Sequence, residues 1–168
     1  MDDTVLVAMR WLTALAVILA SEACAAQQGT EKLVLTVSPL HRANFRAFEQ
    51  WYQTEEHLSP YMGLLDAYRA AFNAATVNAG VQYRRAISVI DSIFGGLPGS
   101  IKKFIGEFFT KLQRPDSSPI VPHGTAGGSC GANCLFGSCT IECPQGTKPR
   151  CFCQWGEPHC GCEPLNTP

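Results

Sequence analysis

Hydrophobic residues recur at helical spacing through the middle of the chain, from residue 38 to residue 113. Ser38 followed by Pro39 is a typical helix start, because a serine side chain caps the first turn and proline suits the first helical position. Aromatic and aliphatic residues then repeat at three- and four-residue intervals, and a second Ser-Pro pair at 59–60 begins another amphipathic stretch. These intervals predict antiparallel helices joined by short loops.

The number of helices depends on how one boundary is interpreted. Residues 78–80 (NAG) are a weak stop signal, so the stretch from 61 to 94 forms either two helices or one long bent helix. Residues 95–99 (GGLPG) are a firm break, after which Ser100 is expected to cap a last helix over 101–113. The predicted fold class is therefore mainly α, with a small antiparallel bundle of three or four helices.

The last predicted helix is the most amphipathic segment of the chain. Its hydrophobic face consists of Ile101, Phe104, Ile105, Phe108, Phe109 and Leu112. Such a face either closes the core of the bundle or lies in a membrane interface. We favour packing, because a small helical segment needs this face to bury its own core. A membrane surface stays as the alternative partner of this helix.

The segment 1–26 has the features of a secretory signal peptide. Residues 11–20 form an uncharged apolar run that has the length of a signal-peptide core and is too short to span a bilayer. Small residues around Cys24 provide a cleavage site. The acidic Asp2 is unusual before such a run, whereas a start at Met9 puts a basic residue there, so we expect translation to begin at Met9.

Cys24 allows a second interpretation, in which it is the acylated residue of a bacterial lipoprotein. A lipobox requires a small or aliphatic residue two positions before the cysteine, and Glu22 does not fit that requirement. The chain is exported under either interpretation. We therefore expect a secreted protein, or one in the periplasm or on the cell surface if the source is bacterial.

Composition and charge narrow the class of protein further. The chain has 168 residues, of which 46% are hydrophobic and 16% are charged, so it is not a disordered protein. This length suits one ordinary domain, or a small domain with a satellite module, rather than a large two-domain enzyme. The formal net charge of −1 provides no basic field that would hold nucleic acid.

The composition changes abruptly after the last predicted helix. Residues 114–129 (RPDSSPIVPHGTAGGS) are rich in proline, glycine and serine, which indicates a flexible linker. We therefore divide the mature chain into a helical domain over 27–113, this linker, a cysteine module over 130–162 and a tail over 163–168. Residues 33–37 have strand composition, but a lone short strand is marginal, so we expect an extended lead-in packed on the helices. The two modules are expected to fold separately.

Eight cysteines fall in the C-terminal module with the spacing C-x3-C-x4-C-x3-C-x7-C-x-C-x6-C-x-C, at Cys130, Cys134, Cys139, Cys143, Cys151, Cys153, Cys160 and Cys162. So short a segment cannot be stabilised by burial alone, and export delivers it to an oxidising compartment, so we expect disulfide bonds. A metal site, with His159 as an added ligand, is the alternative. Structural zinc sites usually contain C-x2-C pairs, and this spacing has none, so no metal or cofactor is expected.

The two C-x-C pairs restrict how the cysteines can be connected. Residues 151 and 153 are too close in the chain to form a relaxed disulfide with each other, and so are residues 160 and 162. On a strand, such pairs point to one face, and the Gly- and Pro-containing residues 154–159 between them favour a hairpin. We expect this face to be bridged mainly to the other four cysteines of the module.

The sequence contains few signs of catalytic chemistry. Residues 127–131 match the letters G-x-S-x-G, but that nucleophile motif needs a strand before it and a helix after it, and here it spans the linker and a cysteine. The histidines are scattered and have no acidic partner at catalytic or metal-ligand spacing; they are His41, His57, His123 and His159. The sequence therefore leaves enzymatic activity undecided and favours none.

We interpret the chain as a secreted, non-enzymatic interaction protein, in which a helical platform carries a disulfide-stapled module. Phe136 and Trp155 lie in short loops of that module and are its candidate contacts with a protein or a glycan. A tryptophan in so small a module can instead form its core, and we favour the core for Trp155. A membrane-active protein using residues 101–113 and a metal-binding cysteine module are the alternatives.

Overall fold

The computed structural model describes residues 30–115 and 127–165. The expected signal peptide with its start at Met9, the Cys24 site and most of the linker lie outside these residues. Within the described part, the chain runs from one strand through four α-helices and a 3₁₀-helix into four further strands. Helices followed by a small disulfide-rich β module are the arrangement that the sequence predicts, so the mainly α fold class is confirmed.

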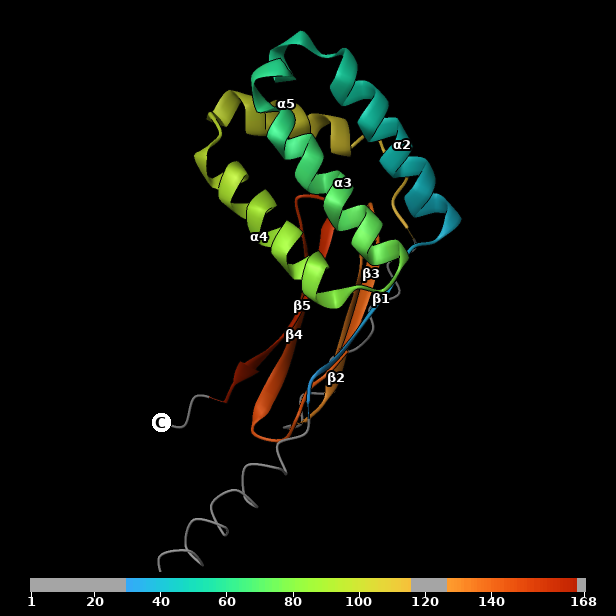
Figure 1. Ribbon diagram of the computed structural model, residues 1–168, viewed down its shortest axis with the longest axis vertical. Coiled ribbons are helices and arrows are strands. Elements are labelled where there is room, and N and C mark those ends of the chain that lie inside the picture. Colours follow the sequence, from blue (N-terminus) through green and yellow to red (C-terminus); the bar gives the residue numbers. More distant parts are fainter. Residues whose placement is uncertain (1–29, 116–126, 166–168) are drawn as a thin grey trace, which may run out of the picture. The chain divides into compact units, whose positions relative to one another are not determined.

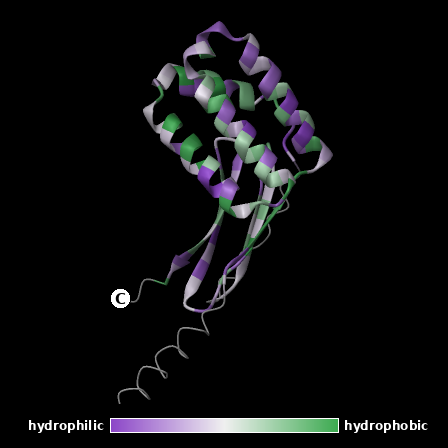
Figure 2. Ribbon diagram, viewed as in Figure 1, coloured by the Kyte–Doolittle hydropathy of each residue, from purple (hydrophilic) through white to green (hydrophobic). Residues whose placement is uncertain are grey.

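The helices occupy the segment that the hydrophobic spacing predicts. They are α2 (Pro39–Thr54), the 3₁₀-helix η1 (Glu56–Tyr61), α3 (Met62–Thr76), α4 (Gly80–Gly96) and α5 (Gly99–Phe109). Hydrophobic and hydrophilic residues alternate along these helices, as Figure 2 shows. Their hydrophobic faces meet in one core, whose largest fully buried side chains include Phe48, Tyr52, Tyr68 and Phe94.

The start of α2 follows the sequence signal closely. The Ser38 side chain accepts a hydrogen bond from the His41 backbone N–H at 3.2 Å, and Nδ1 of His41 accepts one from the Ser38 N–H at 3.0 Å. This is a capping box in which histidine takes the place of the usual glutamate or glutamine. The Nε2–H of the same ring donates to Oδ1 of Asn133 in the cysteine module at 2.9 Å.

One helix boundary decides a question that the sequence left open, and the boundaries of the last helix differ from the prediction. Asn78 has a φ of 54° and lies between α3 and α4, so the stretch forms two helices and not one bent helix. Ser100 does not cap the last helix as predicted, because α5 already begins at Gly99 with Pro98 as the preceding cap residue. The helix also ends at Phe109, earlier than expected.

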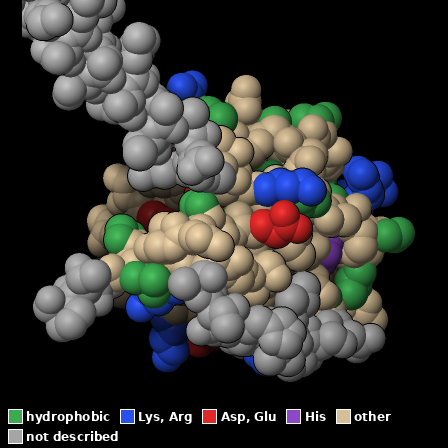
Figure 3. Space-filling model, turned by 90° about the horizontal axis from the view of Figure 1, so that it is seen from below, with side chains coloured by type: hydrophobic (Ala, Val, Ile, Leu, Met, Phe, Trp, Pro, Cys, Tyr) green, Lys and Arg blue, Asp and Glu red, His purple; other side chains and the backbone are tan. Residues whose placement is uncertain are grey.

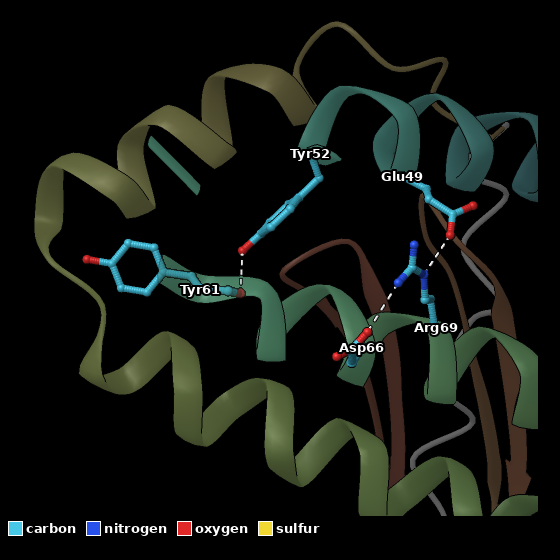
Figure 4. Close-up of polar contacts among 5 residues, drawn as sticks. All are labelled: Glu49, Tyr52, Tyr61, Asp66 and Arg69. Atoms are coloured by element: carbon cyan, nitrogen blue, oxygen red, sulfur yellow. Dashed lines mark hydrogen bonds and ion pairs between the residues drawn. The ribbon is translucent and has the colours of Figure 1, made fainter. Parts of the chain in front are cut away.

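Polar contacts on the surface join α2 to α3 (Figure 4). Arg69 binds Oε1 of Glu49 through Nε at 2.6 Å and Oδ1 of Asp66 through Nη1 at 3.2 Å. Deeper in the fold, the Tyr52 hydroxyl donates to the Tyr61 carbonyl at 2.8 Å, and burial raises the pKa of Tyr52 to about 12. The Arg69 side chain is one-third exposed, so its ion pairs contribute little and the buried ring of Tyr52 contributes more.

The strands form two small sheets. The first has three strands in the order β1-β3-β2, and the second pairs β4 with β5. The strands are β1 (Lys32–Thr36), β2 (Ser129–Asn133), β3 (Ser138–Glu142), β4 (Thr147–Gln154) and β5 (Glu157–Pro164). The last of these runs into residues that the sequence interpretation assigned to a tail.

The lead-in before the helices is strand β1, which corrects the expectation of an unpaired extended segment. It pairs antiparallel with β3, so that Leu33 lies opposite Ile141 and Leu35 opposite Cys139. The local sequence could not show this pairing, because the partner strand lies in the cysteine module, beyond all the helices. Leu35 is buried, and the pairing ties the start of the described chain to the cysteine module.

Four disulfide bonds join the two sheets face to face. They are Cys130–Cys151, Cys134–Cys153, Cys139–Cys160 and Cys143–Cys162. The first two join the β2 segment to β4, and the other two join the β3 segment to β5. The C-x-C pairs lie on an antiparallel hairpin and bridge only to the other four cysteines, so this expected arrangement is confirmed.

The helices and the cysteine module share one hydrophobic core. The ring of Phe136, between β2 and β3, lies 5.2 Å from that of Phe48 and 5.7 Å from that of Tyr68. The turn between β4 and β5 reaches the helices as well (Figure 1). In this turn, the Trp155 ring stacks on that of Phe94, with 4.3 Å between the ring centroids. The described residues from Glu31 onward belong to one compact unit. The linker therefore divides the sequence, whereas this core contains residues from both sides of it. Separate folding of the two modules stays a prediction.

Candidate functional site

Of the two aromatic residues that the sequence offered as contact residues, Phe136 is buried and Trp155 is half-buried. Phe136 is 1% exposed, so it does not form a surface contact, which corrects the expectation for this residue. Trp155 is half-buried on Phe94, and its carbonyl accepts a hydrogen bond from the Tyr68 hydroxyl at 2.7 Å. Both side chains fill the core that the module shares with the helices, and this leaves the binding surface to be found elsewhere.

The hydrophobic face of the last helix is also used for packing. Ile105 is fully buried, and the other members are partly buried against the core; they are Ile101, Phe104, Phe108, Phe109 and Leu112. Phe108 stacks on Trp51 of α2 at 4.0 Å. Among the described residues, no helix is long and apolar enough to cross a membrane.

The cysteines and histidines do not form a metal centre in the described part of the chain. All eight cysteines of the module are paired in disulfides, and no group of three or more potential metal ligands occurs in that part. The ring of His57 contacts Phe104, whereas His41 caps α2. Ser129 of the G-x-S-x-G match lies at the start of β2, which is followed by β3 and not by a helix.

Two grooves remain as candidate binding sites. One lies beside the Cys134–Cys153 disulfide, but it borders on Pro115, the last described residue before the gap in the linker. The other has a volume of about 370 Å³ and is bounded by described residues. It lies between the start of the described chain at Glu31 and Leu33, one face of α4 from Tyr83 to Asp91, and β5 from Pro158 to Cys162. We call it the α4–β5 groove.

Hydrophobic side chains do not mark a competing surface in the view from below. Over the part of that face that is not grey, they are scattered singly or in small groups, and an acidic group lies beside basic ones (Figure 3). Among the described residues, Val77 and Val81 are the most exposed large hydrophobic residues. Scattered hydrophobic residues of this kind are normal on protein surfaces.

The hydrogen-bond pattern of β5 shows which backbone groups face the groove. Successive residues of an antiparallel strand alternate between bonding to the partner strand and pointing their N–H and C=O groups away from it. The Leu165 N–H donates to the Gly146 carbonyl at 3.1 Å, so the backbone groups of Leu165 point toward the partner strand. The Pro158 carbonyl accepts from the Tyr83 hydroxyl on α4 at 2.8 Å, so it points away from the partner strand. Residues 158 and 165 are an odd number of positions apart, and the alternation requires these opposite orientations.

Cys160 and Cys162 lie an even number of positions after Pro158, so their backbone N–H and C=O groups also point away from β4. Within the described part of the chain, these groups have no other hydrogen-bond partner. β1 has an outward edge of the same kind, because the Leu35 N–H donates to the Asn78 side chain at 2.8 Å and not to β3. The α4–β5 groove is thus lined by open strand edges.

The groove also carries an uncompensated negative charge. Oδ1 of Asp91 is buried and has no hydrogen-bond partner among the described residues. Nε2 of His159 is 4.0 Å away, but burial lowers the pKa of His159 despite the opposing effect of Asp91, so the ring is neutral at neutral pH. Arg84 is bound to Glu31 and does not neutralise Asp91 either.

A buried carboxyl group lies next to the groove. Glu157 is 1% exposed, and burial raises its pKa to about 8, so the group is protonated at neutral pH. Its Oε2 lies 3.1 Å from the Tyr83 hydroxyl, which in turn donates to the Pro158 carbonyl. A neutral carboxylic acid can donate to the tyrosine oxygen, and this completes a chain of hydrogen bonds from Glu157 to the backbone of β5.

No family model, curated protein or solved structure matches this chain. Its function must therefore be argued from the groove itself. The arrangement offers main-chain donors and acceptors, one carboxylate and a rigid disulfide frame, which are means of binding a ligand. It does not bring together a nucleophile, a base and an oxyanion site in the described residues.

The groove was not predictable from the sequence, because its helical residues belong to no recognisable motif and its cysteines indicate only disulfide bonds. Tyr83 fits the hydrophobic spacing of a helix in the sequence, and its hydroxyl gives no separate signal. Asp91 lies on the same helix and looks like an ordinary surface charge. One signal was present: Glu157 stands in a tight turn between two cysteine pairs, where a carboxylate is either exposed or buried with a partner.

Proposed function

We propose that this chain is an exported, non-catalytic binding protein and that the α4–β5 groove is its binding surface. The observation that carries the proposal is the open edge of β5 at Cys160 and Cys162, held next to the uncompensated charge of Asp91. Unpaired strand edges bind extended segments through main-chain hydrogen bonds. The disulfides keep this edge in place, so that little ordering is needed when a ligand binds.

Export is part of the same proposal. Four disulfides are typical of extracellular proteins, because the cytosol keeps thiols reduced. The segment 1–26 supplies the signal, with translation from Met9. Of the two partner classes that the sequence left open, the groove favours a protein over a glycan, since a strand edge pairs with a polypeptide backbone.

Site-specific photo-cross-linking in cells that secrete the protein tests this function. A photo-reactive side chain in place of Arg84 lines the groove, whereas the same label at Val89 lies on the exposed side of α4. We expect a discrete adduct from position 84, its loss when Ser88→Trp fills the groove, and no such adduct from position 89. Equal adducts from both positions, or none from position 84, would show that the groove is not the binding surface.

A further inference from the structure

The proposed function leaves the nature of the partner open, and the structure allows a more specific inference that rests on it. We propose that the α4–β5 groove binds an extended peptide segment, which adds as a third strand to β5 along Cys160–Cys162 and places a lysine or arginine side chain against Asp91. The edge of β5, the layering of the two sheets and the charge of the groove each support part of this proposal.

The available edge is short and has defined ends. At one end the Pro158 carbonyl is already bound by Tyr83, and at the other end Pro164 has no N–H to donate. Between these prolines, Cys160 and Cys162 each present one N–H and one C=O group away from β4. A peptide of only a few residues satisfies all four groups. The two prolines also limit pairing with longer strands, a common protection of strand edges.

The layering of the sheets shows where the added strand would lie. β3 and β5 are joined by the Cys139–Cys160 and Cys143–Cys162 disulfides, and β2 lies over β4 in the same way. β1 extends the first sheet beyond β3, and the second sheet has no strand opposite it in the described residues. A strand added to β5 would occupy this position. Leu33 would then pack against it, because Leu33 pairs with Ile141 and shares its inward face.

The charge of the groove selects the side chain. Asp91 has a buried, unpartnered carboxylate oxygen, and Arg84 is bound to Glu31. A basic side chain on the peptide would supply the missing partner at Asp91, whereas an acidic one would be repelled. The Asp91 side chain as a whole is 40% exposed and lines the groove, so a basic side chain of a peptide can reach its carboxylate.

Binding of short synthetic peptides to the intact, disulfide-bonded protein tests the proposal. The probes are a capped pentapeptide of sequence TVKVT, the TVEVT analogue, and TVKVT with alternate backbone nitrogens methylated. In ¹⁵N NMR titrations at millimolar peptide, we expect TVKVT to shift the amide signals of Cys160 and Cys162 and to slow their hydrogen exchange. The methylated peptide should bind at least about tenfold more weakly, because it cannot complete the strand ladder.

Two pairs of variants make the test specific. Ser88→Trp should abolish the shifts by filling the groove, and Val89→Trp on the exposed side of α4 should leave them unchanged. Asp91→Asn should weaken binding of TVKVT about tenfold and remove its preference over TVEVT, whereas Asp66→Asn on α3 should have no effect. Native-like spectra of all four variants, recorded first, establish that each one folds.

Several outcomes would overturn the proposal. One is that the amide signals of Cys160 and Cys162 do not shift when TVKVT is added. The others are equal binding of TVKVT and TVEVT, and the same shifts caused by self-association of the protein without peptide. If the groove forms cross-links in cells but none of the peptides binds there, the chain is a binding protein whose partner is not an extended basic segment. If no cross-link forms at position 84, the proposed function itself fails.

Discussion

Tyr83 on α4 and Glu157 on β5 meet in the interior, with 3.1 Å between the tyrosine hydroxyl and Oε2 of the carboxyl group. Both residues are buried, and burial raises the pKa of each. Oε1 of Glu157 has no hydrogen-bond partner among the described residues. The protonated acid is therefore the form that fits this interior, and its ionisation would leave an unpaired charge between the helices and the cysteine module.

Replacing Glu157 should change how stability depends on pH. The pKa of Glu157 is about 8 in the folded protein and 4.5 in the usual case, so between these values the folded state holds a proton that the unfolded state has released. The stabilising contribution of the protonated group is complete below about pH 4.5 and is lost as the pH rises toward 8. Glu157→Gln keeps the hydrogen bond without the charge, and it should flatten this decline.

Denaturant unfolding at several pH values between 5 and 8.5 measures this effect. Glu163→Gln is the control on the same strand, because Glu163 is exposed and its hydrogen bond with Arg150 lowers its pKa. The control should leave the decline toward alkaline pH in place. An equally steep decline in Glu157→Gln and in the unchanged protein would contradict the assignment of the buried proton to Glu157.

Gly156 and Gly146 allow a matched test of the turn that docks into the helices. Both have positive φ, 83° and 86°, but a Cβ on Gly156 would lie 2.7 Å from the Phe136 ring, whereas one on Gly146 would meet open space. Alanine at either position costs about 1–2 kcal/mol in backbone strain. Gly156→Ala adds the clash with Phe136, typically about 1–3 kcal/mol more. Midpoints of urea unfolding should separate the two variants, and equal midpoints would show that the turn does not dock closely.

Phe136 and Phe152 test whether the helices depend on the cysteine module. Both belong to that module, but Phe136 is buried among helical side chains and Phe152 is 38% exposed on β4. Phe136→Ala should lower the free energy of unfolding by about 3–5 kcal/mol, as is typical of a buried phenylalanine, and Phe152→Ala by much less. The far-UV helical signal and the near-UV aromatic signal should be lost in one transition. If the helical signal of Phe136→Ala melts as it does in the unchanged protein, the helices do not depend on the cysteine module and the two modules fold independently.

Features that depend on neighbouring residues could be predicted from the sequence, whereas pairings between distant segments could not. The start of α2 was predictable because Ser38 and Pro39 act on the turn that they begin. The signal at residues 78–80 is also local, but it left both two helices and one bent helix open. The C-x-C pairs were informative for the same reason, since the alternation of a strand places their sulfurs on one face. β1 was missed because its hydrogen bonds go to β3, and no local pattern records a partner so far along the chain.

The interior role of Phe136 was missed for a related reason. The residue lies between cysteines that bridge within the module, so the sequence associates it with that module. Its ring nevertheless packs on α2, α3 and α5 through Phe48, Tyr68 and Phe109. The groove was out of reach in the same way, because its walls come from β1, α4 and β5, and each contributes residues that are unremarkable in their own segment.

N-terminal sequencing of the secreted protein tests the export signal. We expect the mature chain to begin near Ala26 or Gln27, because the small residues before these positions suit a signal peptidase and the apolar run precedes them. A variant without Met9 should lose secretion if translation starts there. A mature N-terminus before Trp11, or an acylated Cys24, would contradict this prediction.

The order in which the disulfides are reduced should follow their exposure. Cys153 is exposed, whereas Cys151, Cys160 and Cys162 are half-buried, so the Cys134–Cys153 bond is the most accessible to a thiol. Limited reduction followed by alkylation and peptide mass mapping should label Cys134 and Cys153 first. Before reduction the protein should be lighter than its fully reduced form by about 8 Da, two hydrogens for each bond.

A matched pair of double variants shows what each bond contributes to stability. Cys134→Ala with Cys153→Ala and Cys139→Ala with Cys160→Ala each remove one bond, of sequence separation 19 and 21 respectively. Loops of such similar length restrict the unfolded chain about equally, by about 3 kcal/mol each. Loss of Cys139–Cys160 should cost more, because that bond also holds β5 against β3 beside the groove. If guanidinium unfolding shows equal losses in the free energy of unfolding for the two double variants, the bonds act on the unfolded chain alone.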